Sequence, residues 1–325
     1  MAQLITVIIT GCTKLPTTSN TSSVGNVWFD TATQIAKYSF FGGAWCTGGN
    51  LITARFSLAG AGTQNEGLAF GGTDSGFNNV SCTEEYNGSS WSSGGSLITA
   101  RTKLSGAGTQ NAGLAFGGYD SGFATVSCTE EYNGGTNIWS AGGSLITARQ
   151  TLAGAGEQNA GLAIGGFTPS GAVSCTEEYN GSLWSAGGSL ITGRSQLAGA
   201  GTQNAGLTFG GAPQSFASCT EEYNGSTNIW SAGGALSTPR YGLAGSGTQN
   251  AGLAFGGGPA LVSCTEEYNG TSWSAGGSLI TARQNLAGAG TQSLSLAFGG
   301  LAGPSILSGT EEYTIGINSR NFGLK

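Results

Sequence analysis

The residues best suited to acid–base chemistry are twelve glutamates that occur as six neighbouring pairs, each inside the phrase T-E-E-Y. The pairs are Glu84-Glu85, Glu130-Glu131, Glu177-Glu178, Glu221-Glu222, Glu266-Glu267 and Glu311-Glu312. Two carboxylates can hydrolyse a glycoside, but such a site uses one asymmetric pair in a cleft. Here the pair is copied into every repeat, and neighbours on a strand point to opposite faces. We therefore predict a structural role for the glutamates, with a ring of cation sites and a catalytic pair as the alternatives.

Histidine is absent from all 325 residues. Its absence removes the usual general base, the commonest metal ligand and the Ser-His and Cys-His nucleophile arrangements. We therefore predict neither a cofactor nor a metal site, and we expect that the protein is not an enzyme.

Five of the seven cysteines recur once per repeat, at Cys82, Cys128, Cys175, Cys219 and Cys264. Equivalent positions in neighbouring packed sheets lie about 10 Å apart. A disulfide needs Cα atoms within about 7 Å. The spacing therefore predicts buried free thiols that fill apolar space.

A unit of 43 to 48 residues repeats along the chain and must position these groups. Each copy starts at the arginine of an I-T-A-R phrase or a variant of it, at Arg55, Arg101, Arg149, Arg194, Arg240 and Arg283. A Gly/Ala-rich run, the phrase L-A-F-G-G, a variable loop, S-C-T-E-E-Y-N-G and a tryptophan follow. This order predicts four short strands, with the small residues innermost, an alternating third strand such as residues 80–86, and an Asn-Gly turn before the fourth. Since no copy can bury itself alone, we predict radial stacking of blades, with one glutamate of each pair meeting a repeat arginine between blades.

The arginine, the small-residue strand, the double glycine and a tyrosine with a following tryptophan together resemble the kelch repeat. The pairs are Tyr86/Trp91, Tyr132/Trp139, Tyr179/Trp184, Tyr223/Trp230 and Tyr268/Trp273, and the resemblance covers residues 38–314. Membership of this family implies a β-propeller but no single activity, because the fold hosts enzymes, adaptors and lectins.

The last repeat ends after Tyr313 without a tryptophan strand, whereas the N-terminal part supplies Tyr38 and Trp45 before the first repeat. We predict that the Trp45 strand completes the last blade, which gives an all-β, six-bladed kelch-type propeller. A seventh blade built from residues 24–45 and the C-terminal tail is the alternative. The expected domains are an N-terminal docking arm over 1–23, the propeller over 24–318 and a tail over 319–325.

Candidate binding residues lie in the loops that follow the double glycines, because these loops differ between copies while the strands are near-identical. The loops span residues 73–79, 119–125, 167–172, 212–216, 258–262 and 301–306, and they should share one face of the disc. The candidates are Asp74, Phe77, Tyr119, Asp120, Phe123, Phe167 and Phe216. Exposed aromatic residues there suit a protein or a sugar surface. The alternative is that the loops only tolerate variation.

Composition limits the partners. The net charge is −6, and no cluster of Lys and Arg exists to follow a phosphate backbone, so nucleic acid is not expected. No run of about 18 apolar residues is present for membrane insertion.

The segment Gly25-Asn26-Val27-Trp28-Phe29-Asp30-Thr31, with Lys37-Tyr38 and Gly43-Ala44-Trp45, looks like a hairpin module of phage tail and fibre proteins. The near-identical repeats are also similar to kelch-like proteins encoded by phages. This resemblance implies a non-enzymatic virion protein of the tail or capsid surface, made in the host cytoplasm. It would contact other virion proteins through residues 1–23 and a host-surface glycan or protein through the propeller, with homo-oligomer formation left open. The alternatives are a stand-alone lectin or adhesin, a glycosidase and a cytoplasmic adaptor; a copper site of the galactose-oxidase kind would need histidines.

Overall fold

The computed structural model describes residues 27–30, 35–40, 43–212, 217–315 and 318–323, and every element in these ranges is a strand. The chain divides into two compact units, one of residues 43–314 and one to which residues 1–42 and 315–325 belong.

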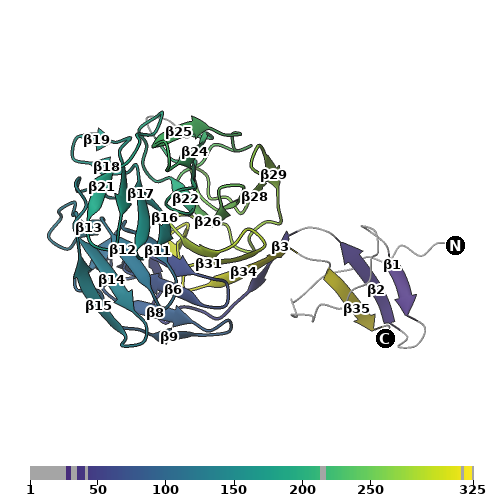
Figure 1. Cartoon of the computed structure of the whole chain (residues 1–325). Coiled ribbons are helices and arrows are strands. Elements are labelled where there is room, and N and C mark those ends of the chain that lie inside the picture. The colour runs from purple at the N-terminus through teal and green to yellow at the C-terminus, as the bar shows by residue number, and fades with distance from the viewer. Residues whose placement is uncertain (1–26, 31–34, 41–42, 213–216, 316–317, 324–325) are drawn as a thin grey trace. The chain divides into compact units, whose positions relative to one another are not determined.

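The larger unit consists of six four-stranded antiparallel sheets arranged as blades around an axis (Figure 1). The innermost strands of blades 1 to 6 are β5 (Ala59–Gly62), β11 (Ser105–Gly108), β16 (Ala153–Glu157), β22 (Ala198–Gly201), β26 (Ala244–Thr248) and β30 (Ala287–Gly290). The second strands are β6 (Gly67–Phe70), β12 (Gly113–Phe116), β17 (Ala160–Ile164), β23 (Gly206–Phe209), β27 (Ala251–Phe255) and β31 (Leu294–Phe298). The third strands are β8 (Thr83–Tyr86), β14 (Thr129–Asn133), β20 (Thr176–Tyr179), β24 (Thr220–Asn224), β28 (Thr265–Tyr268) and β34 (Thr310–Ile315). The outer strands are β9 (Trp91–Ser93), β15 (Ile138–Gly142), β21 (Trp184–Ala186), β25 (Ile229–Ala232), β29 (Trp273–Ala275) and β3 (Gly43–Thr47).

The ring closes through β3, which is the first strand of this unit and pairs with β34 of the last blade. This arrangement confirms the prediction that the Trp45 strand supplies the strand missing from the sixth repeat. Six four-stranded blades result, and the seven-bladed alternative is wrong.

The second unit contains a three-stranded antiparallel sheet of β1 (Val27–Asp30), β2 (Ile35–Phe40) and β35 (Asn318–Gly323). The six residues of β2 pair with the six of β35, from Ile35 opposite Gly323 to Phe40 opposite Asn318. The backbone groups of β2 are therefore bonded to β1 and to the C-terminal strand. Strands β1 and β2, which the sequence assigns to the propeller, belong to the sheet of the second unit, and most of β35 falls in the expected tail over 319–325. The predicted arm over 1–23 lies outside the described residues.

The innermost strands crowd around the axis, and each lies beside the innermost strands of both neighbouring blades. They therefore consist of small residues. A Cβ atom placed on Gly106 would lie 2.5 Å from Cζ of Phe70 and 2.9 Å from the carbonyl oxygen of Gly60 in blade 1. Any side chain there would overlap the neighbouring sheet, so glycine fits where backbones approach this closely.

The hydrophobic core lies between blades rather than at the axis. One cluster joins Leu68 and Phe70 of blade 1 to Ala115, Tyr132 and Trp139 of blade 2. The ring centroids of Phe70 and Trp139 are 5.0 Å apart. Each blade therefore completes the burial of its apolar side chains against a neighbouring blade, as expected for stacked repeats.

The indole N–H of every blade tryptophan donates to a threonine of the preceding blade at 2.9 to 3.1 Å. The bond from Trp45 to Thr265 and the bond from Trp91 to Thr310 join blade 6 to its two neighbours. The same contact thus continues across the closure without a break.

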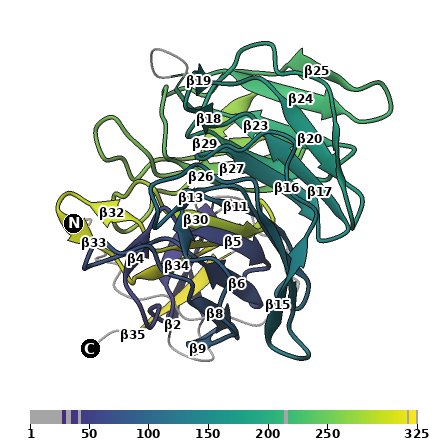
Figure 2. The ribbon, with the colours of Figure 1, turned by 90° about the vertical axis from the view of Figure 1, so that its left-hand side faces the viewer.

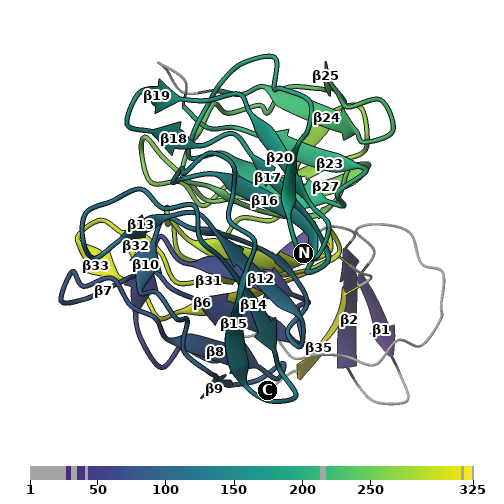
Figure 3. The same ribbon diagram turned by 60° about the vertical axis from the view of Figure 1, so that its left-hand side comes forward.

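In the blades whose loops the structure describes in full, the loops between second and third strands emerge on one face, as predicted, because they join the same two strands in each blade. Short strand pairs form at their bases: β4 (Arg55–Phe56) with β7 (Thr73–Asp74), β10 (Arg101–Thr102) with β13 (Tyr119–Asp120), β18 (Phe167–Thr168) with β19 (Gly171–Ala172), and β32 (Leu301–Ala302) with β33 (Ser305–Ile306). Figures 2 and 3 show β13, β18, β19, β32 and β33 on the same side of the disc. This side is called the loop face.

Candidate functional site

The first glutamate of each pair is buried and forms an ion pair with the arginine of its own repeat. In blade 1, Nη2 of Arg55 lies 3.1 Å from Oε1 of Glu84, and the carboxylate also accepts the backbone N–H groups of Ile52 and Thr53. The expected ion pair therefore exists, but the prediction that it bridges blades is wrong. The arginine stays in its own repeat because it also donates to carbonyls there, at Ala69, Gly71 and Cys82.

These bonds also explain why the third strand starts later than predicted. The carbonyl of Cys82 accepts from Arg55 and from the N–H of Gly71. Its backbone is thus occupied outside the ladder, and β8 begins at Thr83 rather than at Val80.

The second glutamate of each pair accepts a hydrogen bond from a tyrosine hydroxyl of the next blade, at 2.5 to 2.7 Å. Tyr132 donates to Glu85, and Tyr86 donates to Glu312 across the closure. Burial, and then the hydrogen bond to Glu131, raises the pKa of Tyr179 to about 12. All twelve glutamates therefore take part in contacts within or between blades.

The repeat cysteines are unpaired in disulfides but half-buried rather than buried, which corrects the prediction of apolar fillers. In blade 1, Sγ of Cys82 lies 2.8 Å from Nη1 of Arg55. Burial is the main cause that raises the pKa of the Cys82 thiol, and the guanidinium opposes it. The polar contact to arginine explains why these sulfur atoms do not pack in the apolar core.

At the axis, the second residue after each repeat arginine belongs to a closed ring of backbone hydrogen bonds. Each N–H donates to the carbonyl of the equivalent residue in the preceding blade, at 2.7 to 2.9 Å. The members are Ser57, Lys103, Thr151, Gln196, Gly242 and Asn285, called the axial ring below. All six have positive φ, from 50° at Thr151 to 60° at Gly242. This conformation favours glycine and disfavours a β-branched residue such as threonine.

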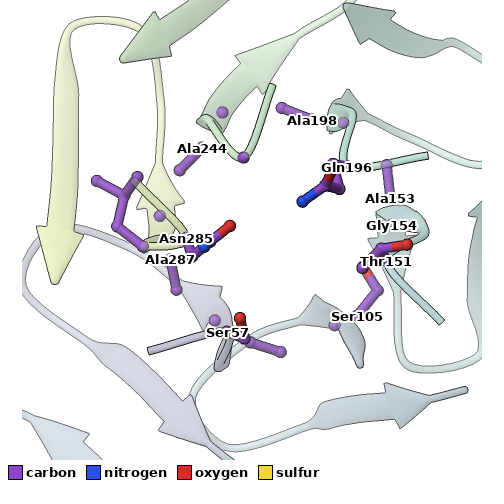
Figure 4. Close-up of a pocket in the computed structure, with 18 of the residues that line it drawn as sticks. Ser57, Ser105, Thr151, Ala153, Gly154, Gln196, Ala198, Ala244, Asn285 and Ala287 are labelled. Carbon is purple, nitrogen blue, oxygen red and sulfur yellow. The ribbon is translucent and has the colours of Figure 1, made fainter. Parts of the chain in front are cut away.

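The axial ring surrounds an opening of about 150 Å³ on the loop-face side of the innermost strands. Figure 4 shows the amide groups of Gln196 and Asn285 extending toward the centre. In the axial ring these two residues are separated by Gly242, and Ser57 follows Asn285. Lys103 is the single titratable residue in the lining, and its Nζ lies 5.5 Å from the ring centroid of Tyr119. The opening is smaller than the pockets of about 300–1,000 Å³ that enclose whole ligands. It can accept one polar group or a few water molecules.

The predicted loop residues of blades 1 to 3 lie on the loop face. Phe77 and Phe123 are 77% and 82% exposed, Phe167 is 42% exposed, and Tyr119 is half-buried with its ring edge toward Phe123. Asp74 and Asp120 each use Oδ1 to accept backbone N–H groups of their own loops. Phe216 lies outside the described residues. The loops thus present aromatic rings on one sector of the face.

The axial ring was not predicted from the sequence, although a signal is visible. Between the repeat arginine and the near-constant L-A-G that follows, the six copies carry six different residue pairs, for example Phe56-Ser57, Thr102-Lys103 and Tyr241-Gly242. Variation between the copies at the two residues after the repeat arginine, and not only in the loops, therefore indicates the axial ring.

Across the described residues, no group of three or more Cys, Asp or Glu side chains is placed to bind a metal ion. Those residues also contain no helix long and apolar enough to cross a bilayer.

Six closed blades and an axial opening define the chain as a six-bladed β-propeller. No protein-family model and no curated protein sequence matches it. Among solved structures it is similar to that of YjhT, with a TM-score of 0.68 over 84% of this chain and 99% of that chain. The two sequences are 13% identical, so the likeness concerns the fold.

Proposed function

We propose that the protein is a non-enzymatic binding module that engages its partner through the loop face. One observation carries this proposal: the six copies differ mainly at positions that gather on this face, namely the loops after the double glycines and the axial ring. The bonds from tryptophan to threonine and from tyrosine to glutamate between blades, in contrast, recur in all six blades. A constant scaffold with variable side chains on one face is typical of a recognition surface.

The chemistry of the loop face supports binding rather than catalysis. The axial opening contains no carboxylate, thiol or phenol, and its lysine is its only titratable group. The glutamates that could serve as acid and base are occupied by Arg, Tyr and backbone donors. An acid–base mechanism would therefore have to break contacts that hold the blades together.

We propose more specifically that the chain is a kelch-repeat virion protein of a phage, located on the tail or on the capsid surface. Tyrosine–tryptophan pairs in contact within five blades, with ring centroids 4.9 Å apart and ring planes tilted by 31° to 37°, support the kelch assignment. The similarity of residues 25–45 to phage tail modules supports the virion role. Residues 1–23 would then contact neighbouring virion proteins, while the propeller contacts a host-surface glycan or protein.

Two experiments test the proposal. Mass spectrometry of purified phage particles should detect peptides of this chain, and their absence would exclude the virion role. Replacement of the six loops by short Gly-Ser linkers should abolish attachment of the isolated protein to host cells, with the far-UV circular dichroism spectrum unchanged. Attachment that survives this replacement would exclude the loop face as the binding surface.

A stand-alone lectin is the second candidate, favoured by the exposed rings of Phe77 and Phe123. Such a protein would bind glycans on an array as a purified domain and be absent from particles.

A further inference from the structure

Blades 1 and 2 carry two copies of one presenting loop, D-S-G-F, at residues 74–77 and 120–123. In both copies the aspartate N–H donates to the carbonyl four residues later at 3.0 Å, and the phenylalanine N–H donates back to the aspartate carbonyl. Oδ1 of each aspartate accepts the N–H of the residue after the phenylalanine at 2.9 Å. The two loops are therefore closed and alike, and both are held at the base by a short strand pair.

Neither burial nor backbone preference explains the phenylalanine at the tip. Phe77 and Phe123 have φ of 60° and 64°, where glycine or asparagine is favoured over an aromatic residue. Both rings point almost wholly into solvent, so they contribute little to the core. A strained backbone that presents an exposed ring indicates a function for the ring.

The two loops are fixed relative to one another. Nδ2 of Asn79 donates to the carbonyl of Tyr119 at 3.2 Å, and Oγ1 of Thr73 donates to Oγ1 of Thr102 at 2.9 Å. Both bonds join blade 1 to blade 2 beneath the loops. The two phenylalanines therefore form one preorganised surface with two equivalent positions.

The chemistry around the rings favours an uncharged ligand rich in hydroxyl groups. In sequence both phenylalanines stand among Ser, Gly, Asn, Ala and Thr, and in the structure Phe123 has the ring of Tyr119 beside it, 6.3 Å away between centroids. Aromatic rings set among small polar residues differ from the contiguous apolar centre of a protein interface. The carboxylates of Asp74 and Asp120 lie in these loops, and the ammonium group of Lys103 lies 5.5 Å from the ring centroid of Tyr119, so charges of both signs are present and neither selects a charged polymer. The apolar C–H face of a sugar ring can pack on an aromatic ring while its hydroxyl groups meet the polar loop atoms.

We propose that the D-S-G-F loops of blades 1 and 2 are two equivalent subsites for a neutral linear polysaccharide, with one sugar ring on each phenylalanine. The inference rests on the proposed binding function and assigns its ligand class and its residues. Two linked weak subsites make polymer binding much tighter than binding of one unit, because the second contact is intramolecular.

The test measures retention of the full-length protein on four immobilised neutral polymers, a β-glucan, an α-glucan, a galactan and a mannan. We expect at least one polymer to bind, at least 100-fold more tightly than its monosaccharide, with little dependence on salt between 0.05 and 0.5 M. Phe77→Ala and Phe123→Ala should each weaken binding at least 10-fold, the double variant should abolish it, and Phe77→Trp should retain it. Ile138→Ala is the matched control, since Ile138 is also exposed but starts β15 at the opposite end of its blade.

Several results would overturn the inference: no neutral polymer is retained, salt abolishes retention, the host receptor proves to be a protein, or the double phenylalanine variant binds normally.

Thermal unfolding distinguishes a role of the phenylalanine ring in stability from a role in binding. Phe77→Gly should leave the thermal midpoint unchanged or raise it, whereas a fall of more than 5 °C would show that the ring stabilises the fold. Host-cell attachment that persists in the double alanine variant refutes only this inference. Attachment that survives replacement of all loops refutes the proposed function itself.

Discussion

Replacement of Arg101 by methionine tests whether the buried ion pairs hold each blade together. Arg101 is fully buried, and its guanidinium donates to the carbonyls of Ala115, Gly117 and Cys128 at 3.4, 3.0 and 2.7 Å. It also lies 3.1 Å from the carboxylate of Glu130. Methionine fills much of the same space but leaves a buried carboxylate with only the two N–H donors of Ile98 and Thr99.

Removal of one partner from a buried pair costs about 3–5 kcal/mol. We therefore expect Arg101→Met to lower the free energy of unfolding by about 4 kcal/mol, which corresponds to a thermal midpoint about 8–16 °C lower in a domain of this size. Adding Glu130→Gln should restore part of the loss, because no charge then remains buried and the amide oxygen can still accept the N–H of Ile98, which bonds to one carboxylate oxygen, although the N–H of Thr99, which bonds to the other, loses its acceptor.

Urea unfolding at neutral pH, followed by tryptophan fluorescence, measures these differences. Lys103→Met is the matched control, because it removes an exposed cation two residues away and should change stability by less than about 0.5 kcal/mol. A loss below about 1 kcal/mol in Arg101→Met would refute the reasoning. The reasoning would also be refuted if the variant that combines Arg101→Met with Glu130→Gln were less stable than Arg101→Met alone.

Three further changes probe the contacts between blades. Trp139→Phe removes the indole bond to Thr83 and leaves space, so it should cost about 1–3 kcal/mol in urea unfolding; a change below about 0.5 kcal/mol would contradict the role of this bond. Gly106→Ala places a Cβ 2.5 Å from Phe70 and should cost about 1–3 kcal/mol, with partial recovery when Phe70→Leu is added. The raised pKa of Tyr179 means that its neutral hydroxyl contributes stability fully below about pH 10, the ordinary tyrosine value, and that this contribution is lost as the pH rises through about 12. The thermal midpoint of the wild type should therefore fall more steeply than that of Tyr179→Phe over this range, and parallel curves would exclude the explanation.

The fold could be predicted from the sequence because the repeats are complete and their ends complement each other. A sixth copy that stops after Tyr313 and an N-terminal strand carrying Trp45 together require a closed ring. The boundary of the propeller was harder to predict, because the pairing of β2 with β35 joins residues far apart in the chain and leaves no local pattern in the sequence.

The contacts that each glutamate of a pair makes could not be predicted from the sequence. Both glutamates were predicted to be structural residues, but which one meets arginine and which meets the next blade depends on strand register and on the stagger between sheets. Glu84 faces Arg55 in its own repeat, whereas Glu85 receives the hydroxyl of Tyr132. The alternation of residues along a strand predicts that the two glutamate side chains point to opposite faces of the sheet. It does not predict which residues each of them contacts.

The axial ring was missed for a related reason. Positive φ at Thr151 cannot be read from a residue type that disfavours it. The conformation is imposed by hydrogen bonds to both neighbouring blades, which exist only in the assembled ring.

Closure through β3 has a consequence for how the protein is made. The ribosome synthesises residues 43–47 before any of the six repeats, and their partner strand β34 follows about 260 residues later, in the sixth copy. Until then the strand lacks its hydrogen-bonding partner and the ring stays open. Contacts between such distant segments slow folding, so we expect premature termination before residue 310 to yield a chain that aggregates through its open edges rather than a smaller stable disc.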